Sequence, residues 1–324
     1  MIKDMETGVN ICLLIAIFNY LATTVAEVNY SGDFNKQCYS RESESPGIYF
    51  PVIRRHWDCP EMLSEMGEEQ DETEWPPPRF PPEDQFFEFT MNGLMPIQRM
   101  WYFSRAQEKN LGKSNNIDPH WTETSIKQLQ SKTKSDEVIS SYEVESDRLI
   151  KKTLEKFRDN IDEKHGIVIG SERPWLEAHL LNANAKHVTT LEYGSIKSDH
   201  SKISTLTPVE LSKRFQEKAL SQFDFGFTYS SLEHSGLGRY GDPLDPCGDL
   251  KTMACAWCII KPGGLFFLNV PTSKDNSSHT FWNAHRVYGR ERLKFMAANW
   301  NVVDKITYPT NNPDTDTVWV FQKP

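Results

Sequence analysis

The sequence has no run of basic residues, and this absence limits the kind of partner that the protein takes. Its 324 residues include 36 Lys and Arg against 45 Asp and Glu, which gives a formal net charge of -9 at pH 7. Nucleic acids are bound by clustered Lys and Arg that displace the counterions of the phosphates. The composition therefore argues against nucleic acid and favours a small or neutral substrate over a polyanion.

The sequence also lacks an apolar stretch long enough to cross a bilayer. Its main apolar segment runs from residue 11 to residue 26, short of the roughly 20 residues that span a membrane. Because small residues precede Glu27, we predict a signal peptide over residues 1–26, cleaved after Ala26, and a lumenal or secreted protein. The positively charged region that usually begins a signal peptide is missing, because nearby acidic residues offset the charge of Lys3. Two alternatives remain. One is a plain helix, and the other is an uncleaved anchor, which would be the one contact with a membrane.

Cysteine is scarce, and an odd number remains once Cys12, inside the apolar segment, is set aside. For a lumenal chain we predict a disulfide between Cys38 and Cys59, because a crosslink would constrain that loop-rich region. Cys255 and Cys258 have the spacing of a redox motif. They lie in an apolar helical stretch, so we expect both thiols to pack in the core.

Two Asn-x-Ser triplets offer acceptor sites for N-linked glycans. They begin at Asn29 and Asn276. Such triplets are compatible with secretion, although they also arise often by chance.

The region from residue 27 to residue 137 does not form a self-contained domain, because acidic and Pro-rich runs separate its short apolar clusters. The densest run, residues 67–85, predicts an extended, solvated linker. A polyproline ligand for an aromatic groove is the alternative. Aromatic segments at 86–89 and 100–103 are expected to pack on the domain that follows.

From residue 138 the pattern changes to alternating helices and strands. Apolar residues at intervals of three and four predict a helix over 138–157. Strands are predicted at 166–169, 187–191, 223–229, 265–270, 302–306 and 317–321. Helices are predicted between them at 174–183, 208–221, 248–260 and 290–299. This alternation predicts an α/β domain over 138–324 with a Rossmann-like, doubly wound, mostly parallel sheet, preceded by an irregular N-terminal extension.

The end of the first strand has the features of a cofactor site. Gly170 and Ser171 turn the chain into a helix whose free N–H groups and positive end attract an anionic group. Glu192 follows the next strand about 20 residues later, where an acidic residue binds ribose hydroxyls. The turn has one glycine. A pyrophosphate needs more glycines, because side chains obstruct its close approach to the backbone, whereas an amino-acid carboxylate demands less. The pattern therefore favours S-adenosylmethionine over NAD, with an ordinary α/β turn as the alternative.

Two later segments resemble class I S-adenosylmethionine-dependent methyltransferases. Residues 223–234, which begin Phe-Asp and end Leu-Glu-His, resemble the fourth strand of that fold, and Lys261-Pro262-Gly263-Gly264 resembles the turn into the fifth. The similarity covers about 160–324 and implies S-adenosylmethionine as the cofactor. Ser230 and Ser231, after the fourth strand, complete the predicted cofactor site. The glycine-poor turn departs from the family pattern and leaves a non-catalytic descendant as an alternative.

Between these two motifs, residues 232–246 look like the signature of an uncharacterised family, domain of unknown function 268, which implies no reaction. The segment begins at the carboxyl edge of the predicted sheet, where ligands of open α/β folds bind. Its glycines permit a tight loop, and we assign Arg239, Asp242 and Asp245 to substrate binding. A rigid surface loop with solvated charges is the alternative.

Methyl transfer requires an aligned nucleophile and, for a hydroxyl acceptor, a base. His234 is the first candidate for the base, since imidazole titrates near neutrality, and Glu233 is the second. A structural role for His234 is an equal alternative. No ligand spacing indicates a metal. We predict O-methylation of a small molecule or glycan in the secretory pathway; the alternatives are a non-catalytic secreted interaction protein and a nicotinamide-dependent oxidoreductase.

Overall fold

The computed structural model describes residues 43–45, 47–68, 77–101, 120–140, 142, 144–310 and 312–324. The predicted signal segment at residues 1–26, Asn29 and Cys38 lie outside these ranges. Within them, no helix has both the length and the apolar character needed to cross a bilayer.

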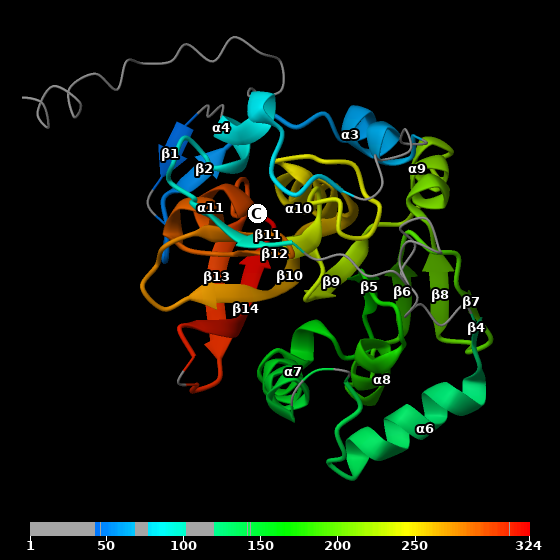
Figure 1. Ribbon diagram of the computed structural model, residues 1–324. Coiled ribbons are helices and arrows are strands. Elements are labelled where there is room, and N and C mark those ends of the chain that lie inside the picture. Colours follow the sequence, from blue (N-terminus) through cyan, green and yellow to red (C-terminus); the bar gives the residue numbers. More distant parts are fainter. Residues whose placement is uncertain are drawn as a thin grey trace, which may run out of the picture. The chain divides into compact units, whose positions relative to one another are not determined.

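A seven-stranded sheet forms the core of the unit Arg41–Pro324 (Figure 1). In spatial order its strands are β13 (Asn301–Thr307), β14 (Asp314–Gln322), β10 (Ile260–Ser273), β9 (Phe223–Tyr229), β5 (His165–Ile169), β6 (His187–Leu191) and β8 (Ile203–Leu206). The strands from β10 to β8 run parallel, whereas β14 runs antiparallel to both β10 and β13. The predicted Rossmann-like, doubly wound and mostly parallel sheet is therefore confirmed.

The central strands are nearly continuous apolar runs because both faces of the sheet are covered. Phe225 and Phe227 of β9 are fully buried and belong to the large core on one face. Gly226 between them faces the other side, where a Cβ atom would lie 2.5 Å from the ring of Phe266. The glycine in this strand thus makes room for an aromatic side chain of β10.

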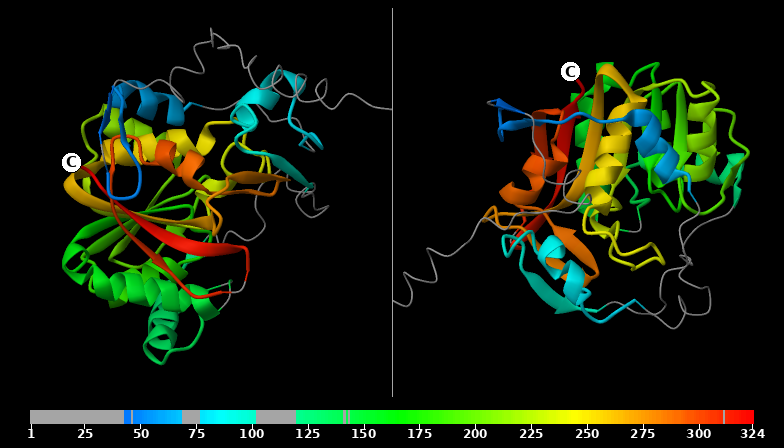
Figure 2. Two further views of the ribbon diagram at one scale, coloured as in Figure 1. Left: turned by 90° about the vertical axis from the view of Figure 1, so that its left-hand side faces the viewer. Right: turned by 90° about the horizontal axis from the view of Figure 1, so that it is seen from above.

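Helices cover both faces of the sheet (Figure 2). One face carries α6 (Glu123–Lys134), α7 (Val144–Lys156) and α8 (Trp175–Asn182); the other carries α9 (Pro208–Gln216), α10 (Gly248–Ile259) and α11 (Arg290–Met296). The helix predicted from residue 138 begins instead at Val144. The backbone N–H groups of Ile139 and Ser140 donate to the carboxylate of Asp147 at 3.3 and 3.1 Å, so the chain turns there before the helix starts.

All six predicted strands are present, and the sequence analysis missed β8 at the edge of the sheet. Its sequence, Ile-Ser-Thr-Leu, is short and has two polar residues between its buried ends. Such a segment lacks the apolar run by which its neighbours were predicted.

The region before residue 138 contributes several short elements, and two of its strands pair with later strands. These are β1 (Ser43–Ser45), β2 (Val52–Arg54), α3 (Cys59–Met66), η1 (Glu83–Gln85), α4 (Phe86–Phe89), β3 (Ile97–Met100) and β4 (His120–Trp121). Strand β3 pairs in parallel with β11 (His279–Asn283), which also pairs with β12 (His285–Val287). Strand β4 pairs with β7 (Lys197–Ser198).

The predicted linker is not solvated throughout, because part of it packs against later segments. Pro77 is buried, and its carbonyl oxygen accepts a hydrogen bond of 3.1 Å from Nε1 of Trp101. The carbonyl oxygen of Pro78 accepts one of 2.9 Å from Nε1 of the fully buried Trp282. Proline carbonyls remain good acceptors, and two tryptophans use them here.

The predicted pairing of Cys38 with Cys59 is wrong, because Cys59 is bonded to Cys258 with a Cα–Cα distance of 5.6 Å. Helix α3 packs against α10 and brings together two cysteines that are 199 residues apart. The prediction that Cys258 is a packed thiol is therefore wrong, because this residue is part of a disulfide. Cys247 is disulfide-bonded as well, whereas Cys255 is a free, buried thiol.

Replacing both Cys59 and Cys258 by alanine should lower the free energy of unfolding by about 2–5 kcal/mol, because the bond limits the freedom of the unfolded chain. Urea titration monitored by tryptophan fluorescence measures this loss. Cys255→Ala, in the same helix as Cys258, is the matched control, and its free energy of unfolding should fall by less than that of the double variant. An unchanged midpoint in the double variant would show that the bond does not hold α3 in place.

Candidate functional site

The order of the strands reverses between β5 and β9. From β5 the chain proceeds outward through β6 to β8, and then returns to β9 on the other side of β5. Ligands of open α/β sheets bind at such a switch point, beside the carboxyl ends of the strands. The predicted residues Gly170, Glu192 and Ser230 directly follow the ends of β5, β6 and β9, so the topology places them along one edge.

Gly170 is a position that only glycine fits. Its φ of 74° is left-handed, and a Cβ atom would lie 1.9 Å from Oγ of Ser231. The backbone N–H of Gly170 donates to the carbonyl oxygen of Leu191 at 3.0 Å. Gly170 and Ser231, both assigned to the cofactor site, are therefore in immediate contact.

Glu177 lies beneath this turn, and the sequence analysis missed it. Its carboxylate is fully buried and accepts hydrogen bonds from Oγ of Ser171 at 3.1 Å and Oγ1 of Thr190 at 2.7 Å. Burial raises its pKa to about 7. The only indication in the sequence was a single acidic residue in the apolar helix Trp175–Asn182. Glu177 thus ties the turn after β5 to strand β6.

Glu192 is held at the tip of β6 by backbone N–H groups. Its Oε1 accepts from the N–H of Tyr193 at 2.8 Å, and the N–H groups of Gly194 and Ser171 also bond to it. Burial raises its pKa to about 7, and the nearby Glu172 adds to this effect. A carboxylate with this placement can accept hydrogen bonds from ligand hydroxyls.

Glu233 lies in η3 (Leu232–His234), directly after β9, and is only 1% exposed. Its Oε1 accepts a hydrogen bond of 2.7 Å from Oγ of Ser230. Its Oε2 has no hydrogen-bond partner among the residues that the structure describes. Burial raises the pKa of Glu233 to about 7. The site therefore contains a buried carboxyl that titrates near neutrality and has one oxygen uncommitted.

His234 has a different environment from its neighbour. Its Nδ1 lies 2.6 Å from the carbonyl oxygen of Ala284, so Nδ1 carries the proton and Nε2 faces Oε1 of Glu233 at 3.6 Å. Burial, followed by the charge of Arg239, lowers the pKa of His234 to about 3. The imidazole is therefore neutral at physiological pH.

The predicted substrate loop uses its polar groups to hold its own backbone. Oδ2 of Asp242 accepts from the N–H groups of Gly236 and Gly238 at 2.7 and 3.3 Å. Oδ1 of Asp245 accepts from the N–H of Cys247 at 2.8 Å. Nη1 of Arg239 donates to the carbonyl oxygen of Ala284 at 2.9 Å, the same oxygen that His234 contacts. These contacts fix the loop beside η3.

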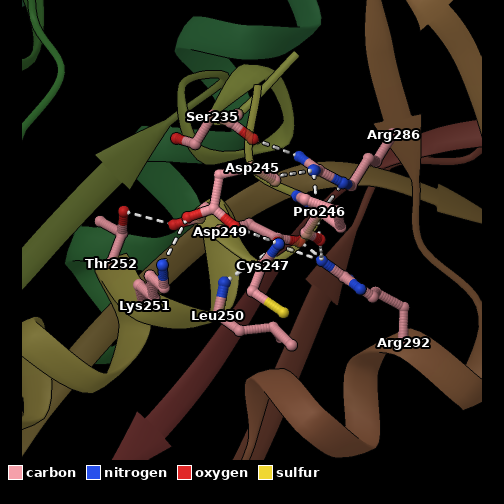
Figure 3. Close-up of polar contacts among 12 residues, drawn as sticks. Ser235, Asp245, Pro246, Cys247, Asp249, Leu250, Lys251, Thr252, Arg286 and Arg292 are labelled. Carbon is pink, nitrogen blue, oxygen red and sulfur yellow. Dashed lines mark hydrogen bonds and ion pairs between the residues drawn. The ribbon is translucent and has the colours of Figure 1, made fainter. Parts of the chain in front are cut away.

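A buried ionic network anchors this loop from below (Figure 3). Asp249 is fully buried and accepts hydrogen bonds from Arg292 and from the hydroxyl of Tyr288, the latter at 2.8 Å. Burial alone would raise the pKa of Asp249, but Arg286 and Arg292 hold it below its usual value. Nη1 of Arg286 donates to the carbonyl oxygen of Ser235 at 2.5 Å. The sequence did not predict the contacts of Asp249 with the two arginines, which come from distant segments.

Three aromatic side chains line the other side of the strand ends. The ring of Tyr229 lies 5.2 Å from that of Tyr142 and 5.0 Å from that of Trp175. A cavity of about 320 Å³ opens farther along α7, between Asp136 and Lys151, and includes none of the predicted site residues. No group of three or more His, Cys, Asp or Glu that could hold a metal occurs in the described ranges.

The sheet topology and the residues at the strand ends define a Rossmann-like α/β domain. Residues 163–318 match the sequence model of the family described as "Caenorhabditis protein of unknown function, DUF268", which confirms the predicted resemblance to that family. No curated protein matches the chain.

Two solved structures are similar to this chain at low identity. One is 1,6-didemethyltoxoflavin-N1-methyltransferase from Burkholderia thailandensis, with 13% identity and a TM-score of 0.42, covering 70% of this chain and 93% of that one. The other is the N-methyltransferase NodS from Bradyrhizobium japonicum, with 13% identity and a TM-score of 0.39, covering 55% and 87%. Both of those proteins were crystallised with S-adenosylhomocysteine.

Asp249→Asn should destabilise the protein by about 3–5 kcal/mol, because it leaves two guanidinium groups buried without a counter-charge. Urea unfolding at neutral pH measures the loss. Glu123→Gln removes one partner of the exposed pair between Lys127 and Glu123 and should change the midpoint little. Equal, small effects of both substitutions would mean that the buried network does not anchor the loop.

Glu177→Gln should change how stability depends on pH. Between about pH 4.5 and pH 7 the unfolded state ionises Glu177 while the folded state keeps it protonated, so its contribution to stability falls as pH rises. The free energy of unfolding of the variant, relative to that of the wild type, should therefore rise by about 3 kcal/mol between pH 4.5 and pH 8. Urea unfolding at both pH values measures the difference. Parallel pH profiles would mean that Glu177 is ionised in the folded protein at low pH.

Proposed function

We propose that the domain over residues 138–324 binds S-adenosylmethionine and transfers its methyl group to an acceptor hydroxyl. The observation that carries the proposal is the convergence of Gly170, Glu192 and Glu233 at the switch point between β5 and β9. Gly170 gives the backbone turn, Glu192 presents a carboxylate for ribose hydroxyls, and Glu233 keeps one oxygen uncommitted. These residues fit a cofactor that carries an amino acid and an adenosine.

The proposal gives Glu233 the role of general base. When bound, S-adenosylmethionine supplies an electrophilic methyl group. A carboxyl with a pKa of about 7 is partly ionised at neutral pH and is a stronger base than an ordinary glutamate. Its uncommitted Oε2 can accept the proton of an acceptor hydroxyl, while Ser230 holds Oε1.

His234 becomes a positioning residue in this proposal rather than the base. An imidazole whose pKa is lowered to about 3 has little affinity for a proton at neutral pH. Because it is neutral, it also leaves the pKa of Glu233 raised, which a cationic imidazolium at 3.6 Å would lower. Its bond to Ala284 connects η3 to the segment between β11 and β12.

The proposed location is the secretory pathway, and the proposed acceptor is a glycan or small-molecule hydroxyl found there. The disulfide between Cys59 and Cys258 supports this location, because such bonds persist in oxidising compartments. The acceptor class follows from the location and from a base suited to hydroxyl groups.

A non-catalytic interaction protein is the second candidate, and the turn after β5 favours it. The N–H of Gly170 bonds to Leu191 and the hydroxyl of Ser171 bonds to Arg173 and Glu177, so these groups are already used within the protein. A turn whose donors are occupied would bind an anionic group weakly.

Glu233→Gln should bind S-adenosylmethionine as the wild type does and lose about 10²–10⁴-fold in turnover, because it removes the base and keeps the side-chain shape. Glu192→Ala should instead weaken binding by about 1–3 kcal/mol. Calorimetry with S-adenosylmethionine, S-adenosylhomocysteine and NAD measures binding, and transfer of labelled methyl groups to a panel of glycans and small alcohols measures turnover.

Glu155→Gln, an exposed position on α7, is the control for both measurements. Binding of NAD alone would indicate an oxidoreductase. Binding of none of the three compounds would support the interaction protein.

A further inference from the structure

The turn between β10 and β11 carries the triplet Asn276-Ser277-Ser278, whose first two residues are exposed. Residues 274–277 are all exposed, and Asn276 has a left-handed φ of 65°. The backbone carbonyl of Asn276 accepts a hydrogen bond of 2.9 Å from the N–H of Arg290. No hydrogen bond links its side-chain amide to any residue that the structure describes, so this amide is available for modification.

Other groups hold the turn in shape. Oδ1 of Asp275 accepts from Oγ of Ser273 at 2.6 Å, and from the N–H and Oγ of Ser277 at 2.8 and 2.6 Å. Oγ of Ser278 accepts from the N–H groups of Gly289 and Arg292 at 2.9 and 3.3 Å. The conformation therefore does not depend on the amide of Asn276, and a bulky substituent there would project from a turn that remains folded.

A second observation concerns the compartment in which the chain folds. Cys59 and Cys258 form a disulfide, and Cys247 is also disulfide-bonded. Bonds of this kind form in oxidising compartments such as the endoplasmic reticulum, where N-linked glycans are also added. The triplet with its exposed Asn276 and the disulfides thus point independently to the same compartment.

We propose that Asn276 carries an N-linked oligosaccharide. The donor is an oligosaccharide on a polyisoprenyl diphosphate, acted on by a lumenal transferase. The amide nitrogen of Asn276 forms a bond to the anomeric carbon of the first sugar, the bond from that carbon to the diphosphate breaks, and the polyisoprenyl diphosphate leaves. The amide proton passes to a base of the transferase. This proposal is independent of methyl transfer.

The position of Ser278 fixes when the transfer occurs. A glycan acceptor needs the hydroxyl at the third position of the triplet. In the folded protein Ser278 is 2% exposed and its Oγ is engaged by two backbone N–H groups. The transferase therefore acts before the turn closes against Gly289 and Arg292.

Backbone geometry alone gives a competing reason for asparagine at this position, because asparagine tolerates left-handed φ better than most residues. Aspartate shares this tolerance and cannot accept a glycan. Asn276→Asp therefore keeps the turn and removes the modification, which separates the two explanations.

The experiment expresses the full-length chain in eukaryotic cells and maps its peptides by mass spectrometry, with and without an enzyme that releases N-linked glycans. The wild type, Ser277→Ala and Ser278→Thr should carry a glycan on the peptide that contains Asn276, because all three keep the triplet. Asn276→Asp should migrate faster by the mass of one glycan and should unfold at the same urea concentration as enzymatically deglycosylated wild type.

The disulfide between Cys59 and Cys258 is mapped in the same sample as a record of the compartment. An unmodified Asn276 in protein that contains this disulfide would overturn the proposal while leaving the lumenal location intact. An unmodified Asn276 in protein without the disulfide would overturn both. Neither outcome bears on whether the domain binds S-adenosylmethionine.

Discussion

The fully buried carboxylate of Asp249 is the constraint on which the candidate site depends. It lies in the first turn of α10, where a negative charge is favoured, and Arg292 from α11 and Arg286 from β12 neutralise it. Because Arg286 also donates to the carbonyl oxygen of Ser235, the network fixes the residue that directly follows η3. The last third of the chain thereby sets the position of Glu233 and His234.

The loop after η3 is rich in polar residues that satisfy backbone groups. Asp242 and Asp245 satisfy backbone N–H groups of the loop, and Arg239 satisfies the carbonyl of Ala284. A tight loop with several glycines has many backbone groups without secondary-structure partners, and each costs free energy if it is buried unpaired. Their roles in substrate binding stay predictions, whereas their roles in holding the loop follow from these bonds.

Local pattern predicted the sheet well, and contacts between distant segments explain what it missed. The apolar strands and the helices between them were predicted because each is visible within a short window, and β8 was missed because Ser204 and Thr205 interrupt its apolar residues. The bond of Cys59 to Cys258 depends on α3 reaching α10, which no local pattern encodes. No local pattern encodes the contacts of Arg286 and Arg292 with Asp249 either. Among the site residues, Gly170, Glu192 and Glu233 were predicted because strand ends are local, and Glu177 acts through the tertiary contact with Thr190.

The charges at the strand ends are consistent with a cationic ligand. Glu192 and Glu233 both have pKa values raised to about 7 by burial, and Glu172 raises that of Glu192 further. Such a group of carboxyls is costly to ionise in the free protein, and a positive charge placed among them lowers that cost. S-adenosylmethionine carries a sulfonium, whereas NAD brings a negative pyrophosphate that these carboxylates would repel. The electrostatics of the strand ends therefore favour the proposed cofactor over a dinucleotide, and the single-glycine turn does so independently, on steric grounds.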